Sequence, residues 1–324
     1  MRHRFAAERI FMNYFDLHCD TPYRMYGEKQ GFDKNELHVS LERASYFGHY
    51  AQLAAYCSAR KRTDEEAFEK YIRVNDYFCA ELERLSDRVK VCLDFSDLEA
   101  AEISGKVAIF HMVEDARILA GDLSRLDFLY QRGCRFLTLV WGQTSCIGGA
   151  HDTSEGLTEF GKSVAKKCFD IGMVPDISHS SEQSVDDLAV IALEKNKPFI
   201  ASHSNSFEVY GHSRNLRDRH LDTIIELGGL VGVSMCDSHI KPKSEGHPAV
   251  DDVIKHIEHY LERGAEDCIA FGCDFDGCDL PDGIESVSDI YKVPERMAQL
   301  NYSETLIEKL CYENARNFIK RNLK

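Results

Sequence analysis

The sequence contains no apolar run long enough to cross a membrane. A transmembrane helix needs about 20 consecutive apolar residues, and polar residues interrupt every apolar stretch of this chain before that length. The run Met1–Arg4 has the positive charge of a signal peptide, but Glu8 and Arg9 follow before an apolar segment develops. No hydrophobic anchoring tail follows Leu323. We therefore expect a soluble, cytoplasmic protein with no membrane partner.

Closely paired cysteines are also missing. The chain has 12 cysteines, spread from Cys19 to Cys311, and no CxxC motif. Cys268, Cys273 and Cys278 recur at a regular interval, but their spacing matches neither a zinc site nor an iron–sulfur site. Without an export signal, we expect reduced thiols rather than disulfides, and we interpret these three cysteines as packing residues.

An excess of positive charge is absent as well. The 39 Lys and Arg residues are outnumbered by 54 Asp and Glu residues, which gives a formal net charge of -15. Binding to nucleic-acid phosphates requires a cationic face. We therefore expect no nucleic-acid partner.

No linker divides the chain. Pro/Gly/Ser-rich stretches, low-complexity tracts and blocks of like charge are missing, and the 44% hydrophobic content is enough for one sizeable core. We therefore predict one domain over residues 1–324.

Short β-rich segments alternate with longer helical patterns along the chain. The predicted strands are Tyr14–Cys19, Tyr50–Cys57, Lys106–Val113, Phe136–Trp141, Val174–Ser178, Pro198–Ser202, Leu230–Met235 and Ile269–Cys273. The predicted helices include residues 64–85, 157–171, 181–194 and 251–263, with a C-terminal helical extension at 303–321. Eight strands alternating with helices predict an α/β fold, a (β/α)8 TIM barrel.

Side chains that bind metals follow these strands, at the barrel end where catalysis takes place. They are His18, Asp20, Glu114, His179, His203 and Asp274. Because side chains alternate along a strand, His18 and Asp20 are expected to face the barrel mouth together, and His111 to face away from Glu114. His179 and His203 end two similar segments, Ile-Ser-His-Ser and Ala-Ser-His-Ser, and this repetition favours metal binding over a structural role.

The carboxylates have structural alternatives. A buried Glu114 requires a cation beside it, although Asp115 and Arg117 would also suit a surface ion pair. Asp274 is our candidate in the last strand-end segment, whereas Asp276, which precedes a glycine, is interpreted as a turn residue.

Taken together, these residues resemble the membrane dipeptidase (renal dipeptidase) family, in its soluble bacterial branch. The resemblance covers nearly the whole chain and rests on residues 16–20 (DLHCD), 156–161 (GLTEFG), 176–179 (DISH), 201–204 (ASHS), 212–216 (HSRNL) and 272–277 (GCDFDG). It implies a barrel of the metal-dependent amidohydrolase type that hydrolyses dipeptides, often with a D-residue at the C-terminal position. It also implies two Zn²⁺ ions.

The resemblance assigns roles to individual residues. It implies that His18 and Asp20 bind the first ion and His179 and His203 the second. It implies further that Glu114 and a water or hydroxide bridge the two ions, that Asp274 is a catalytic residue beside the metals, and that Arg214 is a catalytic residue facing the substrate.

Two positions depart from the family pattern. Asp115 and Ala116 follow Glu114 where the family usually has glycines. Trp141 stands where mammalian members have a substrate-facing histidine, so we expect Trp141 to shape the substrate site and to donate one N–H without titrating.

The predicted reaction is attack of the bridging hydroxide on the peptide carbonyl. Asp274 would move the proton to the leaving amine, and Arg214 would bind a substrate carboxylate or the oxyanion. One alternative is another amidohydrolase that acts on cyclic amides or deaminates a small molecule, although those enzymes usually begin with His-x-His. A second is a binding barrel without metal, although all six candidate side chains keep ligand atoms. A homodimer is a hypothesis that the sequence does not test.

Overall fold

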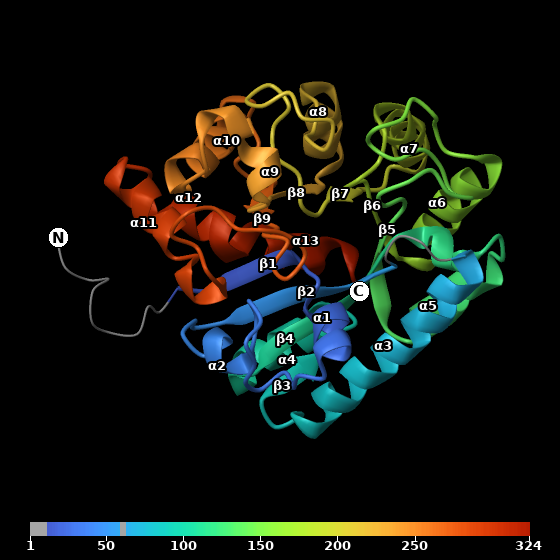
Figure 1. Ribbon diagram of the computed structural model, residues 1–324, viewed down its shortest axis with the longest axis horizontal. Helices are drawn as coiled ribbons and strands as arrows, with labels where there is room; N and C mark the ends of the chain where they lie inside the picture. The colour runs from blue at the N-terminus through green and yellow to red at the C-terminus, as the bar shows by residue number, and fades with distance from the viewer. Residues whose placement is uncertain (1–11, 59–62) are drawn as a thin grey trace.

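The computed structural model describes residues 12–58 and 63–324 (Figure 1). The run Met1–Arg4 lies outside the described residues. The strands are β1 (Tyr14–Cys19), β2 (Tyr50–Cys57), β3 (Val89–Val91), β4 (Val107–Glu114), β5 (Cys134–Thr138), β6 (Val174–Asp176), β7 (Ile200–Ala201), β8 (Leu230–Val233) and β9 (Ile269–Phe271). All their pairings are parallel, and β2 closes the ring by pairing with β1 on one edge and β4 on the other. The predicted barrel is therefore confirmed, with β1, β2 and β4–β9 as its eight strands.

The predicted strands differ from the structure by one missed strand, by one that is shifted, and by one or two residues at several other strand ends. β3 was not predicted, because a three-residue strand is too short to give an alternating pattern. It pairs with the first residues of β4, before β5 takes over that edge. The strand predicted at residues 136–141 is β5, which begins at Cys134 and ends at Thr138, so that Trp141 lies in the loop beyond it.

Helices surround the strands (Figure 1). They are α1 (Thr21–Glu28), α2 (Leu41–Ala44), α3 (Asp64–Arg84), α4 (Phe95–Ser104), α5 (Ser124–Gln131), α6 (Glu159–Ile171), α7 (Glu182–Lys195), α8 (Asp218–Leu227), α9 (Asp237–Ile240), α10 (Val250–Glu262), α11 (Lys292–Gln299), α12 (Glu304–Glu308) and α13 (Asn314–Asn322). The four predicted helices between strands match α3, α6, α7 and α10 within two residues at each end. Capping explains some of this agreement: Ser181 Oγ accepts a hydrogen bond from the Ser184 N–H at the start of α7. In the described part of the chain, none of these helices has the length and apolar character that a bilayer span requires.

The barrel interior is apolar and closed at one end by the C-terminal extension. One buried cluster draws residues from all eight barrel strands, including Phe15, Phe110 and Phe136, and also contains Phe318 and Ile319 of α13. Its members on β6, β7 and β8 are the first residues of those strands. Helix α13 therefore covers the amino ends of the strands, so a catalytic site is expected at the carboxyl ends. The extension predicted at 303–321 consists of α12, a π-helical turn and α13.

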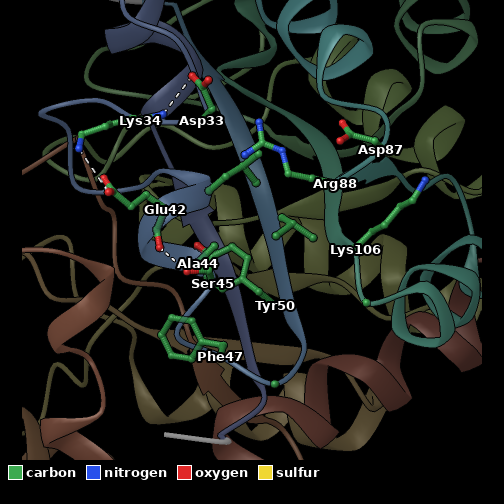
Figure 2. A pocket seen from close by; sticks show the side chains of 14 residues that line it. Asp33, Lys34, Glu42, Ala44, Ser45, Phe47, Tyr50, Asp87, Arg88 and Lys106 are labelled. Atoms are coloured by element: carbon green, nitrogen blue, oxygen red, sulfur yellow. Dashed lines mark hydrogen bonds and ion pairs between the residues drawn. The ribbon is translucent and has the colours of Figure 1, made fainter. Parts of the chain in front are cut away.

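A cavity of about 640 Å³ lies at the amino ends of β2 and β4, where Tyr50 and Val107 line it (Figure 2). Three of its charged side chains have partners nearby: Lys34 Nζ lies 3.3 Å from Glu42 Oε1, and Lys106 Nζ donates to the Ser86 carbonyl at 2.7 Å. None of the predicted site residues lines this cavity.

Two glycines permit a close approach between β7, β8 and β9 at the carboxyl end. A Cβ atom built on Gly232 would lie 2.0 Å from the Ser202 carbonyl oxygen, and one built on Gly272 only 1.7 Å from the same atom. Real Cβ atoms do not approach backbone oxygens so closely. The strand ends that carry His203 and Asp274 therefore require glycine at both positions.

We expect Gly272→Ala to destabilise the protein by about 3 kcal/mol or more, because the added methyl group must push backbone apart in a packed barrel. The matched control is Gly27→Ala in α1, where no heavy atom lies within 4 Å of the added methyl group. That variant should gain up to about 1 kcal/mol from helix propensity. Urea unfolding midpoints check both changes, and equal midpoints for the two variants would contradict the close approach.

Candidate active site

The side chains predicted to bind metal meet at the carboxyl ends of the strands. Three imidazoles surround one carboxylate oxygen: the Nε2 atoms of His18, His179 and His203 lie 3.6, 2.9 and 3.4 Å from Oε1 of Glu114. These residues come from the ends of β1, β4, β6 and β7. Segments far apart in the sequence therefore place their ligand atoms around a single point.

Asp20 and Asp274 complete the cluster on the His18 side. The Nε2 atom of His18 lies 3.8 Å from Oδ1 of Asp20 and 3.8 Å from Oδ1 of Asp274. All six predicted side chains thus lie in one place, which we call the mouth cluster: His18, Asp20, Glu114, His179, His203 and Asp274. His111 faces away from it, as expected, and its ring packs on Phe78 of α3 at 5.9 Å.

Irregular backbone directs these side chains. The pairing of β1 with β2 shifts register between Asp16 and Cys19, so simple alternation does not continue to the strand end. Leu17 stays in the interior cluster, Cys19 packs in the outer layer, and His18 and Asp20 reach the mouth.

His179 and Asp274 adopt left-handed backbone conformations, with φ of 72° and 61°. Residues other than glycine in such conformations cost about 1 kcal/mol or more and gather at functional sites. Asp276, with φ of 68°, accepts hydrogen bonds from Thr21 Oγ1 at 2.5 Å and from the His38 N–H at 2.7 Å. These contacts agree with its interpretation as a turn residue.

Two buried carboxylates behind the mouth cluster were missed by the sequence analysis. Asp176 accepts hydrogen bonds from Thr138 Oγ1 and Ser202 Oγ at 2.6 and 2.7 Å. Ser202 Oγ in turn lies 2.8 Å from Nδ1 of His203, which orients that ring. A signal existed in the sequence, because Asp176 lies inside the motif that ends in His179.

Asp16, at the other side of the barrel, also holds neighbouring strand ends together through hydrogen bonds. It accepts hydrogen bonds from Tyr14 Oη at 2.5 Å, from the His18 N–H at 2.9 Å and from the Cys273 N–H at 3.1 Å. Asp16 therefore ties β1 to the segment after β9, where Asp274 lies.

Burial makes the imidazoles of the mouth cluster neutral. It lowers the pKa of His18 to about 3, with a further contribution from the Arg214 charge, and it lowers the pKa values of His179 and His203 well below the usual range. Neutral imidazole is the form that binds metals.

The carboxylates shift in the opposite direction. Burial raises the pKa of Glu114 and of Asp20 well above the usual range, and the negative charges of neighbouring carboxylates raise both further. Burial also raises the pKa of Asp274 to about 7, against the opposing effect of Arg214. The protein alone therefore stabilises the ionised carboxylates poorly.

The donor atoms fit a metal ion. Among the described residues, both ring nitrogens of His18, Oδ1 of Asp20 and Oε2 of Glu114 are buried without a hydrogen-bond partner, although buried polar atoms are normally paired. The Nε2 atoms of His179 and His203 lie 2.9 Å apart. Cations between these groups would satisfy His18 Nε2 and the carboxylate oxygens, and mixed imidazole and carboxylate donors suit zinc.

Arg214 and Trp141 lie beside the mouth cluster. Arg214 is 5% exposed, and its Nη2 atom lies 3.5 Å from the His203 carbonyl oxygen. The Trp141 ring lies 6.1 Å from the His179 ring. Two histidines that the sequence analysis did not assign to the site lie on this side as well. The His151 ring is 6.4 Å from His179, and burial lowers the pKa of His239 to about 2, with the Arg214 charge adding to the effect.

The chain matches the family model described as membrane dipeptidase (peptidase family M19) over residues 6–322. It is 27% identical over 237 residues to an uncharacterised protein from the pqqA 5′ region of Klebsiella pneumoniae, covering 70% of this chain and 86% of that protein.

Solved structures give the same result. A metallopeptidase described as dipeptidase AC has a TM-score of 0.88 and 26% identity, covering 97% of this chain and 99% of its own. A metallopeptidase from Rhodobacter sphaeroides, liganded with a phosphinate mimic of the dipeptide L-Ala-D-Ala, has a TM-score of 0.87 and 26% identity, covering 96% and 99%. Together with the match over nearly the whole chain, these likenesses imply a metal cofactor, and they establish that this chain belongs to the membrane dipeptidase family, peptidase family M19, as a metallo-dipeptidase.

Proposed function

We propose that this enzyme hydrolyses dipeptides with two zinc ions. His18 and Asp20 would hold one ion, His179 and His203 the other, and Glu114 would lie between them. The observation that carries the proposal is the arrangement of three imidazole nitrogens around one Glu114 oxygen, within 3.6 Å, among buried donors that lack partners.

The proposed substrate class follows from the family and from the buried guanidinium of Arg214. The relative from Rhodobacter sphaeroides binds a mimic of L-Ala-D-Ala, and we propose that the present enzyme likewise accepts a D-residue at the C-terminal position. A dipeptide carries a terminal carboxylate close to its peptide bond. The buried guanidinium of Arg214 is suited to bind that carboxylate or the oxyanion.

The chain's own residues position the reactants. When bound, the zinc pair supplies an activated water and a Lewis acid for the peptide carbonyl. Asp274, whose Oδ1 lies 3.8 Å from His18 Nε2, would accept the proton of the attacking water and deliver it to the departing amine. Trp141 would border the substrate from the loop after β5 and keep water away from it.

We also propose that the enzyme works in the cytoplasm. All twelve cysteines lie among the described residues, and none of them forms a disulfide, which agrees with a reducing compartment. The homodimer remains a hypothesis.

A substrate panel tests the reaction. We expect turnover of L,L-dipeptides and of dipeptides with a C-terminal D-residue, and none of N-acetylated amino acid amides, which lack the terminal carboxylate. Cyclic amides and nucleobases serve as the comparison. Turnover confined to those two classes would overturn the proposal and favour the alternative amidohydrolase chemistry.

Elemental analysis tests the metal ligands. We expect about two zinc ions per chain in the wild type and fewer in His179→Asn, since Asn tolerates the left-handed backbone at this position but supplies no imidazole. Chelation should also lower the melting temperature of the wild type, because it removes ligands that bind only the folded state. The matched control is His247→Asn, a half-exposed histidine outside the mouth cluster. Unchanged zinc content and activity in His179→Asn would refute the site.

Arg214→Lys tests the role of the guanidinium. Lysine keeps the charge but loses the planar fork, so we expect kcat/KM to fall by about 10²-fold, the scale of losing one oxyanion donor. The control is Arg217→Lys, where the guanidinium pairs with Glu182 at 2.7 Å on the outside of the barrel. Equal kinetics in the two variants would remove Arg214 from the substrate site.

A further inference from the structure

A second group of potential ligands lies beside the mouth cluster. The Sγ atoms of Cys236 and Cys278 and a carboxylate oxygen of Asp274 all lie within 4.8 Å of one another. Cys236 follows β8, and Cys278 follows β9. The family motifs in the sequence do not include either cysteine.

We propose that Cys236, Cys278 and Asp274 form a binding site for an additional soft divalent cation, such as Zn²⁺ or Cd²⁺, whose binding inhibits the enzyme. The inhibitory part rests on the proposed function, because it requires Asp274 to carry the proton during hydrolysis. Thiolates favour soft cations over Mg²⁺ or Ca²⁺, and a carboxylate oxygen completes a mixed zinc ligand set.

The backbone holds the two cysteines close together. The Asp237 N–H donates to the Asp279 carbonyl at 3.0 Å, which joins the residues directly after Cys236 and Cys278. The Met235 N–H, directly before Cys236, donates at 3.2 Å to the carbonyl of Cys273, which precedes Asp274. At zinc–sulfur distances of about 2.3 Å, tetrahedral ligands lie roughly 3.8 Å apart. The three ligand atoms therefore need only small side-chain movements to bind an ion.

The residues around the two cysteines offer the cation a fourth ligand and a route from solvent. The Nε2 atom of His239 lies 3.9 Å from the Sγ atom of Cys236. Cys236 is buried, whereas Cys278 is partly exposed, so an ion would reach the site past Cys278. Of the three regularly spaced cysteines, Cys268 and Cys273 pack in the core as predicted, and Cys278 has the different role proposed here.

Inhibition follows from the shared carboxylate. Asp274 belongs both to the mouth cluster, 3.8 Å from His18 Nε2, and to the cysteine group. A cation held by the two sulfurs and this carboxylate would engage the side chain that accepts the proton. It would also add positive charge next to Arg214.

Cadmium titration of the zinc-loaded enzyme tests the site. We expect one additional cadmium ion per chain, an ultraviolet thiolate-to-cadmium charge-transfer band, and loss of dipeptidase activity over the same concentration range. In Cys236→Ser and Cys278→Ser the band should disappear. The cadmium concentration for half-inhibition, measured against each variant's own activity, should rise by at least about tenfold, as expected when a metal site loses a partner.

Cys57→Ser is the matched control, because the Cys57 sulfur lies within 4.8 Å of ligand atoms of Asp20 and Glu114 on the other side of the mouth cluster. Loss of the band in Cys57→Ser alone would place cadmium at the catalytic ions and overturn the proposal. An active enzyme without the band would do the same, as would a Cys236–Cys278 disulfide in the isolated protein. If dipeptidase activity is absent but the band appears and depends on Cys278, the cation site is supported and only the proposed function fails.

Discussion

Burying the Glu114 carboxylate among three neutral imidazoles is unfavourable unless cations lie between them. The enzyme nevertheless concentrates these groups at one end of the barrel, where burial lowers the pKa values of the histidines and raises those of the carboxylates. The proposed metal site therefore couples metal binding to folding, because ions that satisfy the donors would also offset the cost of burying them. The rest of the structure holds these groups in place despite that cost.

That support comes from polar anchors and from close backbone contacts. Asp16 and Asp176 bind backbone and hydroxyl groups of neighbouring strand ends, and through them fix the segments that carry His18, His203 and Asp274. Gly232 and Gly272 let the last three strands approach the Ser202 carbonyl. The left-handed backbone at His179 and Asp274 turns their side chains towards the mouth. The buried carboxylates, the close backbone contacts and the left-handed residues would each be unfavourable in an isolated segment. The packing of the whole barrel supplies the energy that maintains them.

Two chemically different groups of side chains border the mouth cluster. Arg214, Trp141 and His151 lie near His179 and suit an anionic substrate that must be oriented. Asp274 adjoins two thiols, one of which lies 3.9 Å from His239. Asp274 belongs to both the mouth cluster and the thiol group, so the proton carrier of the proposed reaction would also be the point at which a soft cation interferes.

The sequence by itself determined the fold class, the family and the residue types of the mouth cluster. Alternating strands and amphipathic helices are local patterns, and barrel topology brings all strand ends of one polarity together, so His18, His179 and His203 could be placed without coordinates. Glu114, for which the family pattern was weaker, nevertheless lies at the centre of the three histidines. That the whole chain forms one domain stays a prediction.

Only the tertiary structure decided the contacts that depend on irregular backbone or on distant partners. The register shift in β1, the short strand β3 and the left-handed residues interrupt the periodic patterns from which strands are predicted. The roles of Asp16 and Asp176 depend on partners in other strands, and the meeting of Cys236 with Cys278 depends on how two loops pack. Sequence patterns report which face of an element is buried, whereas distances between side chains on different loops arise only when the barrel closes.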